Sequence, residues 1–208
     1  MTSLRSWLEQ EAQARVERAV AELEQKCAAE VVVTVRRSSG DYRAADLTFA
    51  SAMCFVALVV YVYFPVVFAD DPMPPALLAL FLVSVFLSSQ FWPLRRLLLR
   101  RATLRRNVRR AALTEFHDQR ITRTRGRTGI LIYASLFERE LEVVFDVGLD
   151  LATLGDGGAR AVATIRGALR SGGLEELVRG LSALGDALAP VRPHAADDVN
   201  ELPDAVVS

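Results

Sequence analysis

Two long runs without a charged residue lie in the first half of the sequence, at residues 47–69 and 72–94. Each run has 23 residues, and only Asp70 and Asp71 separate them. As a helix with a rise of 1.5 Å per residue, each run would measure about 35 Å, enough to cross a hydrocarbon core about 30 Å thick. Both runs are apolar on all sides, whereas a helix in a soluble core usually keeps a polar face. The sequence therefore predicts a two-helix transmembrane hairpin with an acidic turn.

Arginines flank this hairpin on both sides and are missing from its turn. Eight follow the second run directly: Arg95, Arg96, Arg100, Arg101, Arg105, Arg106, Arg109 and Arg110. Three more, Arg36, Arg37 and Arg43, precede the first run. Because Lys and Arg near span ends stay on the cytoplasmic side, both flanks are predicted to face the cytoplasm and the acidic turn to face out. We therefore expect a multi-pass protein of the inner (cytoplasmic) membrane with both termini in the cytoplasm.

The basic stretch from Arg95 to Arg110 also indicates a partner. A cluster of arginines beside a membrane is typical of contact with anionic lipid headgroups. A protein that binds single-stranded nucleic acid would interleave aromatic residues with the arginines, but Phe116 is the only aromatic residue between Arg95 and Arg127. We therefore expect the lipid bilayer, and anionic lipid in particular, as partner, with a membrane-protein partner as an open alternative and no nucleic acid.

Outside the hairpin the sequence alternates between helical and extended patterns. Helices are predicted at residues 3–29, 97–121, 158–169 and 174–188, strands at residues 30–37, 128–135 and 141–147, and an acidic, proline-containing tail at residues 190–208. Because a single strand has two unpaired edges, the first strand is expected to pair with residues 129–134 and 141–145. The prediction is an α/β fold, a small sheet flanked by helices, in which residues 1–46 and 95–189 form one domain interrupted by the hairpin at residues 47–94.

A continuous motif crosses the two strands that follow the hairpin. It runs through residues 124–139 (TRGRTGILIYASLFER) and continues at residues 142–149 (EVVFDVGL). This pattern resembles the TPM domain family, in which an Asn/Thr-Gly precedes an apolar strand, a Glu-Arg or Asp-Arg turn follows, and the next strand ends in Asp/Gly-x-Gly-Ile/Leu. The first strand and residues 200–204 (NELPD) are similar to the membrane-embedded bacterial branch. The resemblance implies an α/β/α arrangement, a small sheet between helices.

The same resemblance implies several activities. Some relatives are acid phosphatases, some bind a divalent metal, and others assist the assembly or repair of membrane complexes. In metal-binding relatives an acidic residue commonly precedes the Asn-Gly, but Arg127 and Thr128 occupy those positions here. Asp146 and Asp150 remain, and two carboxylates without a third oxygen ligand make a poor site for a hard cation. We therefore predict no metal and no cofactor.

Three residues are the candidate ligand-binding groups. Arg125 and Arg127, on either side of a glycine, could bind a phosphate or carboxylate, and Asp146 lies at the end of the following strand. Neither the histidines nor the cysteines form a recognisable catalytic motif, so no catalytic residue is predicted. We expect a non-catalytic module for partner or lipid binding or for assembly. The alternatives are a metal-assisted phosphatase that uses Arg127 with Asp146 or Asp150, and a structural subunit of a membrane complex.

Overall fold

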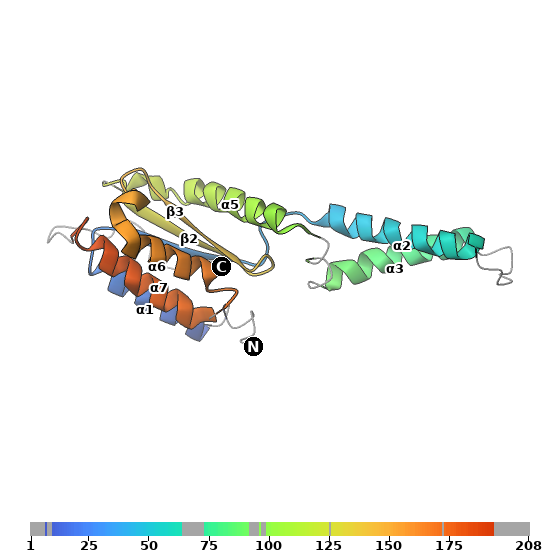
Figure 1. Ribbon diagram of the computed structural model, residues 1–208, viewed down its shortest axis with the longest axis horizontal. Helices are drawn as coiled ribbons and strands as arrows, with labels where there is room; N and C mark the ends of the chain where they lie inside the picture. The colour runs from blue at the N-terminus through green and yellow to red at the C-terminus, as the bar shows by residue number, and fades with distance from the viewer. Residues whose placement is uncertain are drawn as a thin grey trace. The chain divides into compact units, whose positions relative to one another are not determined.

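The computed structural model describes residue 7, residues 10–63, 73–91, 96, 99–124, 126–171 and 173–193 (Figure 1). The chain divides into two compact units. The first unit consists of Met1–Ser39 and Arg105–Ser208, and the second is Gly40–Leu104. Both ends of the sequence thus contribute to one unit, and the second unit is inserted between them.

The first unit is built on a three-stranded sheet in the order β1-β2-β3. The strands are β1 (Glu30–Arg36), β2 (Gly129–Ser135) and β3 (Glu140–Phe145). β1 runs parallel to β2, and β3 runs antiparallel to β2. All seven residues of β2, the central strand, are buried, as its run of Ile, Leu and Tyr requires. The predicted small sheet flanked by helices is confirmed.

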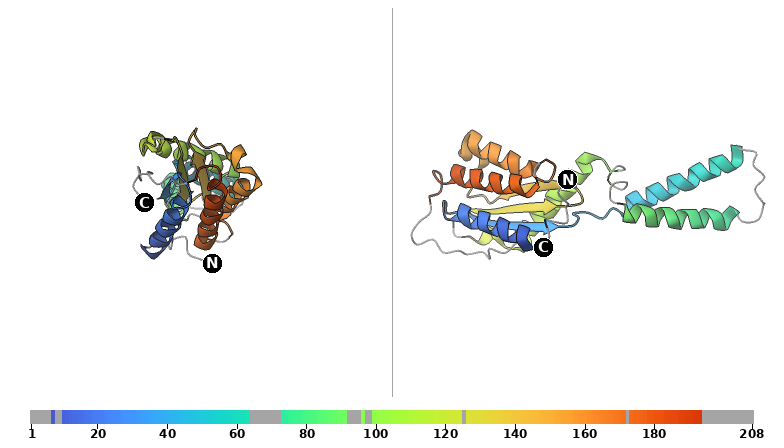
Figure 2. Two further views of the ribbon diagram at one scale, coloured as in Figure 1. Left: turned by 90° about the vertical axis from the view of Figure 1, so that its left-hand side faces the viewer. Right: turned by 90° about the horizontal axis from the view of Figure 1, so that it is seen from below.

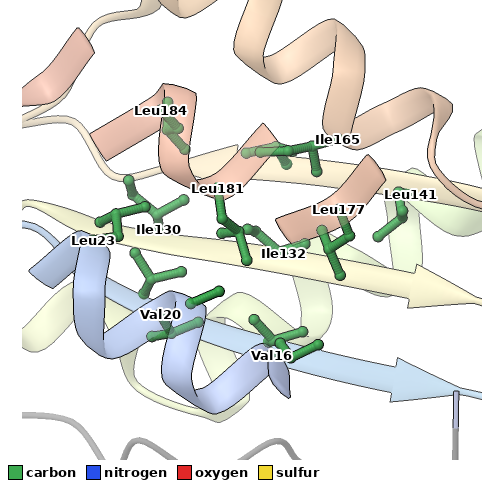
Figure 3. Close-up of a cluster of buried hydrophobic side chains, with 14 of the residues drawn as sticks. Val16, Val20, Leu23, Ile130, Ile132, Leu141, Ile165, Leu177, Leu181 and Leu184 are labelled. Carbon is green, nitrogen blue, oxygen red and sulfur yellow. The ribbon is translucent and has the colours of Figure 1, made fainter. Parts of the chain in front are cut away.

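Three helices cover one face of the sheet: α1 (Gln10–Glu24), α6 (Gly155–Gly167) and α7 (Gly173–Leu188). Their apolar stripes meet the inward side chains of the strands in the main core, which Figure 3 shows in part. Leu177, Leu181 and Leu184 of α7 are fully buried, and they recur every three or four residues, as the amphipathic pattern predicts. β1 contributes Val31, Val33 and Val35 to the same cluster.

The opposite face of the sheet is covered by α5 (Arg101–Asp118). In the left view of Figure 2, α5 (green) lies across the sheet from α1 and α7. Val108, Ala112 and Phe116 recur every four residues along α5 and pack on Val32 and Leu131. The sheet is therefore buried on both faces. On β1 this second face, with Val32 and Thr34, is buried.

The second unit is a pair of helices, α2 (Arg43–Tyr63) and α3 (Met73–Gln90). Both are long and apolar enough to cross a membrane by length and composition. They meet through small side chains, among them Ala50, Ser84 and Ser88, and the hydroxyl of Ser88 donates a hydrogen bond to Asp46 Oδ1 at 2.8 Å. α2 begins four residues before the predicted apolar run, and residues 64–72 and 92–95 lie outside the described part.

The remaining helix boundaries differ from the sequence prediction by a few residues. α6 begins at Gly155 and not at residue 158, and α5 begins at Arg101 and not at residue 97. A short 3-10 helix, η2 (Ile121–Arg123), follows α5. Of the predicted tail, only residues 190–193 are described, and Pro193 pairs with Cys27 in an isolated antiparallel bridge.

Candidate functional site

Two of the three predicted site residues contact each other. Nε of Arg127 donates to Asp146 Oδ2 at 2.9 Å, and an Nη of Arg127 donates to Asp146 Oδ1 at 3.0 Å. The Asp146 side chain is 1% exposed, whereas the Arg127 side chain is 49% exposed. The pair is thus a bidentate ion pair between a buried carboxylate and a half-exposed guanidinium group. Arg125 lies outside the described residues.

The local backbone explains why these two side chains meet. The amide of Asp146 donates to the carbonyl of Gly129, and the amide of Gly148 donates to the carbonyl of Arg127, both at 2.9 Å. A Cβ on Gly148 would lie 2.4 Å from the carbonyl oxygens of Gly126 and Arg127. Only glycine allows this approach, and it brings the loop after β3 against the loop that carries Arg127. Arg127 itself has a positive φ of 52°, which is uncommon for a residue other than glycine.

This geometry bears on the chemistry available to the site. Asp146 Oδ1 also accepts a hydrogen bond from the amide of Val147 at 2.7 Å, so both carboxylate oxygens already have donors. Asp150, the other carboxylate considered for a metal, accepts from the amide of Ala152 at 3.0 Å and caps the 3-10 helix η3 (Leu151–Leu154). Among the described residues no group of three or more His, Cys, Asp or Glu side chains could hold a metal ion.

A groove that sequence reasoning missed lies between α5, β3 and α6. It has a volume of about 710 Å³, within the range of about 300–1,000 Å³ that is typical of small-molecule sites. Five arginines line it: Arg105, Arg106 and Arg109 from α5, Arg166 from α6, and Arg170 from the turn after α6. The apolar lining includes Val108, Leu141 and Val162. The arginines of α5 are evident in the sequence. That Arg166 of α6 and Arg170 after it line the same groove could not be predicted from the sequence.

Two glutamates of β3 partly neutralise this groove. Glu140 accepts hydrogen bonds from Arg105, at 3.4 Å, and from Arg170. Glu142 accepts a hydrogen bond from Arg166 at 3.0 Å. Within the part of the chain that the structure describes, Arg106 and Arg109 have no carboxylate partner. The lining thus holds five arginines against two glutamates, and Arg106 and Arg109 are the two that no acidic side chain of the described residues contacts.

Sequence reasoning also missed a polar cluster beyond the C-terminal end of β1, the end remote from Arg127 and Asp146. The amide of Ser39 donates to Glu138 Oε1 at 2.8 Å, and Ser135 Oγ donates to Glu138 Oε2. Ser39 Oγ donates to Ser135 Oγ at 2.7 Å and contacts the hydroxyl of Tyr133 at 3.3 Å. Glu138 is 1% exposed, although it lies in the turn between β2 and β3. Every oxygen of this carboxylate has a donor, which indicates a structural role.

Burial raises the pKa of the Tyr133 phenol in this cluster above its usual value of 10.0, and the nearby carboxylates of Glu115 and Glu138 add to the effect. The hydrogen bond with Ser39 and the charge of Arg36 act in the opposite direction without cancelling it. Tyr133 is therefore a neutral hydroxyl at physiological pH, not an ionised group.

Comparison with known proteins gives a fold and no family. No protein-family model matches the chain, and no curated protein matches it. Among solved structures, the NMR structure of the BA42 protein from the psychrophilic bacterium Bizionia argentinensis is similar, with a TM-score of 0.57 and 16% sequence identity. The match covers 96% of this chain and 93% of that one. At this identity the likeness shows the α/β fold alone.

Proposed function

We propose that the protein is an integral membrane protein that carries a TPM-like domain on the cytoplasmic face of the inner membrane, and that this domain binds anionic lipid or a membrane protein without catalysis. The observation that carries the proposal is the exposure of apolar side chains on α2 and α3. Only 17% of the most apolar stretch of α2 and 11% of that of α3 is buried. A core helix of a soluble protein is mostly buried, so this pattern favours lipid as the surroundings.

The exposed side chains are large. They include Phe55, Val56, Val62, Leu78, Leu82 and Phe86, each at least half exposed. In water each would cost about 25 cal/mol for every Å² of apolar surface left uncovered. In a bilayer the same surface contacts acyl chains, and the short polar contact between Asp46 and Ser88 is kept inside the helix pair.

The arginine distribution supports the orientation. α2 begins with Arg43, and α5, which follows the hairpin, carries five arginines, whereas the segment between the two apolar runs has two aspartates. Six residues separate β1 from α2, and such a connection reaches about 25 Å at most. A domain tied this closely to the bilayer can present its basic residues to anionic headgroups.

The non-catalytic part of the proposal is supported by the pairing of Arg127 with Asp146. A phosphatase would need Arg127 to stabilise charge on the substrate and Asp146 to act as a base, nucleophile or metal ligand. Each group instead neutralises the other. The pair is therefore better suited to holding two loops together than to binding a substrate.

Two measurements on the full chain test the proposal. Alkaline carbonate extraction of membranes should leave the protein in the pellet, as expected of an inserted hairpin. Reporter fusions in the turn at Asp70 and Asp71 should be active outside the cytoplasm, and fusions after Ser208 should be active in the cytoplasm. Release into the carbonate supernatant would contradict membrane insertion, and a C-terminal reporter active only outside would contradict the orientation.

A further inference from the structure

The groove between α5 and α6 combines charge and apolar surface in a way that a solvated basic helix does not need. Arginines on a helix that serves only general attraction to a membrane can point in any outward direction. Here five of them converge on one cavity, beside a strand that forms an edge of the described sheet. A cavity lined by apolar side chains and by several cationic groups is typical of a specific site for an anionic ligand.

We propose that this groove binds the phosphate headgroup of an anionic phospholipid, which rests on the membrane insertion proposed above. Arg106 and Arg109 supply the charge, because they are the groove arginines without a carboxylate partner among the described residues. They lie three residues apart on α5, so their side chains emerge from the same side of the helix. Two guanidinium forks match the non-bridging oxygens of a phosphate diester.

The other three arginines have a different part in the groove. Arg105 and Arg170 are held by Glu140, and Arg166 is held by Glu142. These pairs fix the side chains along the wall of the groove, and three arginines against two glutamates leave one positive charge among them. Glu140 also competes with an incoming phosphate for two of the arginines, so it lowers the affinity of the groove for any anion.

The apolar lining distinguishes a phospholipid from a free phosphate ester. Val108, Leu141, Leu151 and Val162 line the same cavity. Inorganic phosphate or a sugar phosphate would leave this surface in contact with water. The glycerol backbone and first methylene groups of a phospholipid would cover it, with a gain of about 25 cal/mol for each Å² removed from water.

A pair of matched double variants tests whether the groove or the overall charge binds the lipid. Arg106→Gln with Arg109→Gln removes the unpaired groove arginines. Arg101→Gln with Arg110→Gln removes the same charge from exposed positions on α5 that do not line the groove. Each arginine near an anionic headgroup changes affinity roughly fivefold, so the groove variant should lose roughly 30-fold if both contact the phosphate.

The measurement uses the full chain purified in detergent. Short-chain phosphatidylglycerol is titrated in, and bound lipid is counted by native mass spectrometry, with short-chain phosphatidylcholine and glycerol phosphate as comparison ligands. We expect phosphatidylglycerol to bind more tightly than either, the groove variant to lose this binding, and the control variant to keep it. Glu140→Gln should tighten binding, a gain that partial unfolding cannot produce.

Three results would overturn the proposal: equal losses in the two double variants, no preference for phosphatidylglycerol over phosphatidylcholine, or equally tight binding of glycerol phosphate. Equal losses would indicate that the overall charge of α5 attracts the lipid. Equally tight binding of glycerol phosphate would indicate a soluble phosphate ester as the ligand. Carbonate extraction of the same variants separates this failure from failure of the proposed function. Protein that stays in the membrane without discriminating between lipids contradicts the groove alone, whereas protein released from the membrane contradicts the insertion on which the groove proposal rests.

Discussion

The backbone amide of Ser39 donates a hydrogen bond to the carboxylate of Glu138 over 2.8 Å, although 99 residues separate them in the sequence. Ser39 is the last residue of the first unit before the inserted helices, and Glu138 lies in the turn between β2 and β3. The contact therefore fixes the point at which the chain leaves the sheet domain. Because Glu138 is buried, its hydrogen bonds are formed away from competing water.

Glu138→Ala should lower the free energy of unfolding of the sheet domain by about 2–4 kcal/mol, because it leaves the amide of Ser39 and the hydroxyl of Ser135 without their acceptor. Thermal unfolding followed by circular dichroism in detergent measures the change. Glu176→Ala is the matched control, since within the described residues that glutamate has only a pair with the exposed Arg179, at 3.8 Å, and the change should cost about 0.5 kcal/mol or less. Equal effects of the two changes would contradict a structural role for the cluster.

The raised pKa of Tyr133 predicts a loss of stability in alkali. Below about pH 10 the phenol is neutral in both the folded and the unfolded chain, so it adds no pH dependence. Above that pH the unfolded chain loses the proton first, and the free energy of unfolding falls until pH reaches the folded-state pKa. Tyr133→Phe should remove this part of the decline. Thermal unfolding of parent and variant at about pH 8 and about pH 11 tests it, and parallel declines would contradict the assignment.

Val33→Asp should unfold or strongly destabilise the sheet domain. Val33 is 2% exposed in the main core, so the new carboxylate would be buried without a partner at a cost of about 3–5 kcal/mol. Val147→Asp places the same charge on a side chain that is 81% exposed and should cost about 0.5 kcal/mol or less. Protease resistance and melting temperature give the comparison. A parent-like Val33→Asp variant would show that β1 is not part of the core.

The pairing of Arg127 with Asp146 predicts the absence of phosphatase activity. Purified protein should hydrolyse phosphate esters no faster than an Arg127→Ala, Asp146→Asn double variant, with or without added divalent cations, because Asp146 is buried and each side chain neutralises the other. A chromogenic phosphate ester provides the assay, and circular dichroism confirms that the double variant is folded. Activity of the parent that disappears in a folded double variant would establish an enzyme.

The sequence was sufficient to predict the strands and helices that periodicity and β-branched residues determine. A run such as EVVVTVR favours a strand wherever it occurs. The need of that strand for a partner predicted pairing with both β2 and β3. In the described sheet it pairs with β2 alone, and β3 lies on the far side of β2. The two apolar helices followed from the length of the runs and from their lack of charged residues. These predictions depend on local composition, which a single sequence displays directly.

The side-chain relationships depended on distant parts of the chain. Arg127 and Asp146 are adjacent because Gly148 allows two loops to approach and because Arg127 adopts a positive φ, and neither feature can be read from residue types. Glu138 lies in the turn between β2 and β3, and its burial depends on Ser39, which follows β1 and donates its amide to the carboxylate. The groove requires α5 and α6 on either side of β3, so no single segment contains its pattern.

The parallel pairing of β1 with β2 sets an order for the synthesis of the protein. Glu30 lies opposite Gly129, and both α2 and α3 are encoded between them. A ribosome therefore synthesises β1 and both apolar helices before it synthesises β2, the strand with which β1 pairs. Until residue 129 emerges, the nascent chain carries a valine-rich strand with two open edges. On the proposed topology the hairpin enters the membrane first and the sheet closes last, so a failure of insertion would leave an aggregation-prone strand for chaperones and proteases to remove.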